Sequence, residues 1–167
     1  MTTIPTVPQP KRKWYALSLR HLRMASRLLD SGFADGAVFH TYHAYECVLS
    51  AFIAAKGHPV PPDGRLQLPG NRRIYGYRSA RDEETFHQGG THKIRQILFG
   101  ELANQSKPYY AKYQALSRYI SLDDRMDSLY YDTRHDRLPQ EIYNSSFAVG
   151  VITEVRLFAR EVWKEIR

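Results

Sequence analysis

The chain of 167 residues is long enough for one domain with a full core, and its 43% hydrophobic content is ordinary for a globular protein. Its single cysteine, Cys47, excludes an internal disulfide and any cysteine-based zinc site. The formal net charge of +7 favours polyanionic partners such as nucleic acid, and the lack of an apolar signal sequence leads us to expect a cytoplasmic protein.

The first residues predict an arm followed by a helix. Prolines at positions 5, 8 and 10 indicate a flexible N-terminal arm over 1–12, ahead of a single helical domain over 13–167. We expect a first helix over 13–31, stopped by Gly32. Its predicted buried face is the set Trp14, Leu17, His21, Met24 and Leu28. A basic stripe of Lys13, Arg20, Arg23 and Arg27 is most simply a solvated face.

The segment 36–55 is apolar nearly all round and carries one formal charge, Glu46. We expect a second helix here, covered on several sides by other helices and closed by Gly57. The run is long enough to span a bilayer, but His40, His43 and Glu46 would be costly there, so we expect no membrane association.

Glu46 is the first candidate site residue, because a buried carboxylate needs a cationic or hydrogen-bonding partner. His40, His43 and Glu46 follow one another at intervals of three residues along one side of the helix. This ladder allows a metal site. We favour buried histidines that hydrogen-bond to neighbouring tyrosines, and predict neither metal nor cofactor.

Residues 58–90 form a Pro/Gly/Arg-rich insert between the second and third helices, in which 65–77 can form a short β-hairpin. Arginines without an intervening acid, together with Tyr75 and Tyr77, suit phosphate contacts and base stacking. A solvated loop or a protein-docking flap fits equally well. The candidate binding residues of the insert are Arg72, Arg73, Arg78, Arg81 and His87.

The second half of the chain predicts further helices. We expect them over 92–103 with Thr91 as N-cap, from Pro108 onward, and over 145–167, with an additional or kinked segment after Ser121. The predicted fold class is an all-α, antiparallel up-and-down bundle of four or five helices. Inward positions of the third helix are Ile94, Ile97, Leu98 and Leu102. A broad aromatic surface is predicted for the fourth, from Tyr109, Tyr110, Tyr113 and Tyr119 with Leu116 and Ile120.

A polar break before the last helix holds the second candidate site. Arg134 and His135 are the candidate catalytic residues, and Tyr131 and Asp136 are candidate binding residues beside them. A guanidinium can clamp a phosphate and an imidazole can move a proton near neutral pH, which is the minimum for metal-free RNA cleavage. The alternative is a polar loop whose charges pair among themselves. The chain has no phosphate-binding glycine loop, GxSxG elbow or HExxH motif.

The order of these pieces resembles the HEPN family of small helical bundles. The likeness is carried by the run from Gly36 to Glu46 with Leu49 and Gly57, by Thr91 to Ile94, and by Tyr131 to Asp136 ahead of Pro139. It covers residues 14–57 and 90–165, and the insert has no counterpart. The resemblance implies that Glu46 and Arg134 face a shared cleft, and that the protein forms a homodimer through helices with exposed tyrosines.

Members of that family are often metal-independent ribonucleases or toxins, in which an arginine precedes a histidine by four to six residues. Others lack the pair and act as nucleotide- or partner-binding subunits beside a nucleotidyltransferase. In this chain Arg134 and His135 are adjacent, and Arg81 and His87 have the spacing but lie in the insert. We therefore predict an RNA- or nucleotide-binding module, and the family's toxins suggest a toxin–antitoxin or defence system as its setting. The alternatives are a metal-independent ribonuclease using Arg134 and His135, and a structural subunit that docks a protein partner.

Overall fold

The computed structural model describes residues 11–58, 60, 90–120 and 136–167, with the side chains of 90–94, 117 and 118 excepted. Within these ranges the chain forms six helices and no strand, which confirms the all-α class for this part of the protein. They are α1 (Lys11–Asp30), α2 (Ala34–Ala55), α4 (Gly90–Leu102), α5 (Pro108–Tyr119), α7 (Pro139–Ile142) and α8 (Ser145–Ile166). None of the described helices is both long and apolar enough to cross a bilayer.

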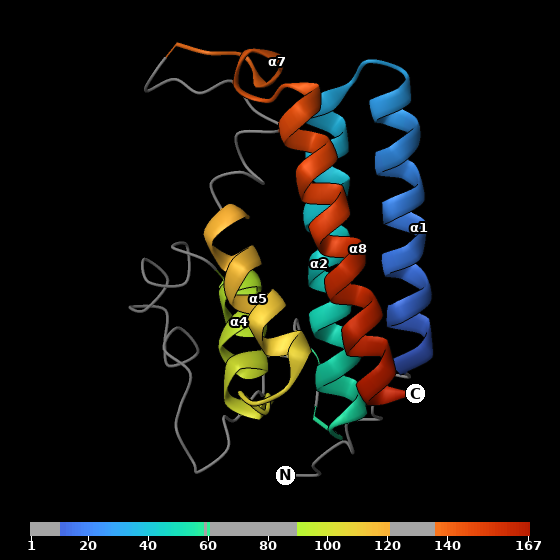
Figure 1. Ribbon diagram of the computed structural model, residues 1–167, viewed down its shortest axis with the longest axis vertical. Coiled ribbons are helices and arrows are strands. Elements are labelled where there is room, and N and C mark those ends of the chain that lie inside the picture. The colour runs from blue at the N-terminus through green and yellow to red at the C-terminus, as the bar shows by residue number, and fades with distance from the viewer. Residues whose placement is uncertain (1–10, 59, 61–89, 121–135) are drawn as a thin grey trace, which may run out of the picture.

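Helix α2 lies at the centre of the structure, as its apolar sequence predicts. It contacts α1, α8, α4 and α7, and most of its residues from Ala37 to Ala54 are buried. The three long helices α1, α2 and α8 lie side by side (Figure 1). Lys56, just after α2, pairs with Glu165 near the end of α8 at 3.7 Å, so these two helices run in the same direction. The amine of Lys11 donates to the carbonyl of Ile166, so α1 runs opposite to α8.

Helices α4 and α5 form a separate antiparallel pair beside α2 and α8 (Figure 1). The Tyr113 hydroxyl donates to the Gln96 carbonyl and joins the two helices. Arg95 of α4 lies opposite Ser50 of α2, and the later Leu98 packs with Ile53, so α4 runs parallel to α2. The predicted up-and-down alternation therefore does not hold at this step.

Glycine ends two helices at the expected positions. Gly32 and Gly57 have φ values of +86° and +78°, and this left-handed conformation favours glycine because it has no Cβ. Helix α8 is capped by Asn144, whose side-chain oxygen accepts from the Phe147 amide at 2.8 Å. Helix α4 begins at Gly90, so Thr91 lies inside the helix and is not its N-cap as predicted.

The buried face of α1 differs from the predicted one. Leu17 and Met24 are each 36% exposed, whereas Ser18, Leu22 and Ala25 are buried. Helix α1 packs against both α2 and α8, and small side chains allow these close approaches. The Ser18 hydroxyl is satisfied by donating to the Tyr15 carbonyl at 2.7 Å.

The predicted tyrosine surface of α5 is mostly core. Tyr109 is buried against Phe52 and Phe99, with ring centroids 5.3 and 6.0 Å away. Leu116 and Ile120 are also buried, and Tyr119 is exposed. Tyr110 and Tyr113 are partly buried, so Tyr119 is the one exposed tyrosine that α5 offers to the predicted homodimer contact.

Candidate functional site

The structure describes three of the predicted site residues, Glu46, His43 and Asp136. The other predicted site residues lie outside the described residues: Arg72, Arg73, Arg78, Arg81, His87, Tyr131, Arg134 and His135. The predicted hairpin over 65–77 also lies outside them. Asp136 is exposed with a φ of +54°, and it precedes α7 at one end of the molecule (Figure 1).

Glu46 is buried, as predicted, with 5% of its surface exposed. Its Oε1 lies 3.6 Å from Nη1 of Arg95, so a carboxylate of α2 and a guanidinium of α4 form an ion pair inside the protein. Arg95 also donates from Nε to the Ser50 hydroxyl at 3.1 Å. The pair compensates two charges that would each be costly to bury alone.

Sequence reasoning missed Arg95 as a partner of Glu46, and the contact that the resemblance implies with Arg134 lies outside the described residues. A local signal was present, because Arg95 shares a helical face with Leu98, Phe99 and Leu102. Leu98 and Phe99 are fully buried, whereas the predicted inward residue Ile97 is 37% exposed. An arginine at a buried position of an amphipathic pattern indicates an internal acidic partner.

Three histidines extend this polar group towards α1. His43 Nδ1 lies 3.4 Å from Glu46 Oε2, and the Nδ1 atoms of His21 and His40 are 3.0 Å apart. The His21 ring is 5.3 Å from that of His40 and 5.4 Å from that of His43. We call Glu46, Arg95, His43, His21 and His40 the Glu46 cluster. The expected hydrogen bond from a tyrosine to His40 is replaced by the contact with His21.

The surroundings keep two histidines of the Glu46 cluster neutral. Burial, followed by the charges of His43, His40 and Arg20, lowers the pKa of His21 to about 4. Burial and then His43 also lower the pKa of His40. In a neutral imidazole one ring nitrogen donates and the other accepts, so the Nδ1 of one histidine can donate its hydrogen to the Nδ1 of the other. The 3.0 Å contact between the two Nδ1 atoms fits such a bond.

The Glu46 cluster is a structural connection between α1, α2 and α4. In the part of the chain that the structure describes, no group of three or more His, Cys, Asp or Glu side chains is placed to hold a metal ion, so the ladder on α2 gains no support as a metal site. Burial, then Glu46, raises the pKa of the neighbouring Cys47 thiol to about 12, which makes it unreactive.

A second candidate site lies between α1 and α8, on a surface that contains part of the basic stripe of α1. This α1–α8 groove has a volume of about 480 Å³. Arg23 of α1 and Arg156 and Arg160 of α8 supply its charge, and its apolar lining is Tyr15, Leu19, Leu22 and Ala159. Arg156 donates to the Ser26 hydroxyl across the helix pair at 2.5 Å. Within the described ranges, none of the three arginines makes an ion pair.

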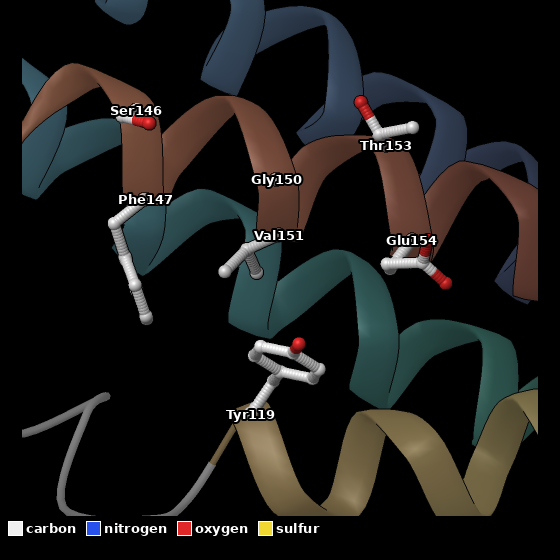
Figure 2. Close-up of a pocket in the computed structure, with 7 residues that line it drawn as sticks. All are labelled: Tyr119, Ser146, Phe147, Gly150, Val151, Thr153 and Glu154. Carbon is white, nitrogen blue, oxygen red and sulfur yellow. The ribbon is translucent and has the colours of Figure 1, made fainter.

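A pocket between the end of α5 and the first half of α8 has an acidic lining residue, in contrast to the basic α1–α8 groove. Figure 2 shows Tyr119 of α5 lying across from Phe147 and Val151 of α8. The pocket has a volume of about 380 Å³, and its charged lining residue is Glu154, which pairs with Lys112 at 3.4 Å. A carboxylate in the wall disfavours an anionic ligand, so the α1–α8 groove is the better phosphate site of the two.

Comparison with known proteins identifies no relative. No family model, no curated protein and no solved structure matches this chain.

Proposed function

We propose that this protein is an RNA- or nucleotide-binding module that uses the basic face of α1 and the neighbouring arginines of α8. The proposal depends mainly on one observation: three arginines that form no ion pair among the described residues converge on the α1–α8 groove, and no acid is among the described residues that line it. Like charges that gather without compensation repel one another, and a phosphate chain relieves this repulsion by binding.

Helix α1 has a strong excess of positive charge. Its acidic residue is Asp30, at the last position, and its basic residues are Lys11, Arg12, Lys13, Arg20, Arg23 and Arg27. All of these basic side chains except Lys11 are exposed. A basic stripe of this kind can be a solvated face, but here Arg156 and Arg160 of another helix continue it. Convergence from two helices favours a binding surface.

We also propose that the fold is a HEPN-like bundle that carries the insert over 58–90 and assembles as a homodimer. The buried acid on an apolar second helix and the order of the long helices support this relation. In that setting a nucleotidyltransferase-like protein is a further partner. The proposed phosphate surface on α1 and α8 is additional to the contacts predicted for Arg134 and the arginines of the insert.

The test is the affinity for a fluorescently labelled single-stranded RNA, measured by anisotropy at several salt concentrations. We expect the wild-type affinity to fall steeply as the salt concentration rises. In an Arg156→Ala/Arg160→Ala variant, the slope of log affinity against log salt should be shallower by about 0.7 per lost phosphate contact. A matched control, Arg137→Ala/Lys164→Ala, removes the same charge from exposed positions outside the groove. Absent binding at low salt, or equal effects of the two double variants, would contradict the proposal.

A further inference from the structure

We propose that the α1–α8 groove receives one unpaired nucleotide of a single-stranded RNA, with the base on the apolar lining and the adjoining phosphates on the arginines. This inference rests on the proposed function and specifies its ligand. It follows from the combination, within one groove, of guanidinium groups and a sizeable apolar wall. Phosphate contacts alone need no such wall.

The apolar wall offers a flat surface that is held in place. Tyr15 stacks on Trp163 with ring centroids 4.3 Å apart and an interplanar angle of 20°. Tyr15 lines the groove and Trp163 does not, so the stacking holds a groove residue in place from outside the groove. Leu19 extends this surface and is 38% exposed, so its apolar side chain is accessible from the groove. Aromatic stacking binds any base, because every base has a π-face.

The arginines are positioned along the two helices that bound the groove. Arg156 is held by its hydrogen bond to Ser26, and Arg23 Nε contacts the Leu19 carbonyl at 3.4 Å. Arg160 is close enough to Tyr15 that its charge opposes the rise in the tyrosine pKa caused by burial. Each guanidinium has donors left over for a phosphate, since it has five N–H groups.

The size and chemistry of the groove favour a nucleotide over other anions. Its volume of about 480 Å³ lies within the range of small-molecule sites, roughly 300–1,000 Å³. Bases of a duplex are covered by their neighbours and cannot reach the wall, whereas bases of a single strand can. A polyglutamate chain would use the arginines but has no aromatic or large apolar group for Tyr15 and Leu19.

The experiment compares Leu19 with Leu17, which is on the same helix, is 36% exposed and does not line the groove. The probes are a labelled uridine dodecamer, the same sequence in a duplex, adenosine monophosphate and polyglutamate. We expect the wild type to prefer the single strand. Leu19→Ala should weaken its binding about fivefold and Leu19→Glu more, with little change for the duplex. Leu17→Ala should bind both RNAs like the wild type. Leu17→Glu should do the same, or its added charge should lower the affinity for the single strand and the duplex equally.

The outcomes separate this inference from the proposed function. If the Arg156→Ala/Arg160→Ala variant loses affinity but Leu19 and Leu17 variants behave alike, RNA binding stands and the nucleotide site is wrong. Competition by polyglutamate as strong as that by RNA would indicate an acidic protein partner and overturn the inference. If adenosine monophosphate binds as tightly as the dodecamer, the ligand of the groove is a free nucleotide, and the inference of an RNA strand is wrong. Thermal melting checks that each Leu19 variant is folded.

Discussion

The buried pair of Glu46 and Arg95 makes a prediction about stability that follows directly from its geometry. Arg95→Met retains an apolar stem but removes the guanidinium that lies 3.6 Å from the Glu46 carboxylate. It also removes the donor to the Ser50 hydroxyl. The side chain of Glu46 is 7% exposed, so water cannot replace the lost charge. Breaking a buried pair from one side costs about 3–5 kcal/mol, a large part of the roughly 5–15 kcal/mol that stabilises a typical domain.

Urea unfolding followed by circular dichroism measures this cost, provided that the slope with denaturant is unchanged. The double variant Glu46→Gln/Arg95→Met buries no charge and should be clearly more stable than the sum of the single variants predicts. An exposed pair, Lys164 with Glu161, is the control, and Lys164→Ala should cost less than about 1 kcal/mol. An Arg95→Met variant within about 1 kcal/mol of the wild type, or strict additivity in the double variant, would refute the reasoning.

Three further predictions follow from other parts of the structure. His21 has a pKa of about 4 when folded against an ordinary value of 6.5, so the unfolded chain binds more protons between these values and stability should fall as the pH falls through this window. The difference between wild-type and His21→Gln unfolding curves isolates this contribution, and a difference that is flat from pH 7 to pH 4 would disprove it. Cys47 is buried with a thiol pKa near 12, so a thiol reagent should label it only in urea, and rapid labelling of the folded protein would contradict its placement. Gly57→Ala should destabilise the protein by about 1 kcal/mol through its φ of +78° alone, since a Cβ there meets nothing within 4 Å, and an unchanged melting midpoint would count against this backbone conformation.

Local sequence patterns predicted the five longer helices of the described residues and several of their ends, and missed the short α7. The apolar composition of 36–55 was enough to place α2 inside, because a helix that is apolar all round must be covered. Gly32, Gly57 and Pro108 mark helix ends through their own backbone preferences, which require no knowledge of the rest of the chain.

Patterns within one helix could not supply the contacts between helices. The face of α1 was misplaced because α1 packs against two neighbours, and Ser18 and Ala25 face inward while the larger Leu17 and Met24 do not. The relative direction of α2 and α4 is a property of the whole fold, so Arg95 could not be matched to Glu46 by spacing. The α1–α8 groove likewise combines residues more than a hundred positions apart, of which the sequence showed only the part on α1.

The most direct test of the proposed function is the salt dependence of RNA binding in the wild type and in an Arg23→Ala/Arg156→Ala/Arg160→Ala variant. We predict a linear decrease of log affinity with log salt for the wild type, and a slope shallower by about 2 in the triple variant if each arginine holds one phosphate of a single strand. A triple variant that is folded and keeps the wild-type slope would show that the α1–α8 groove binds no RNA.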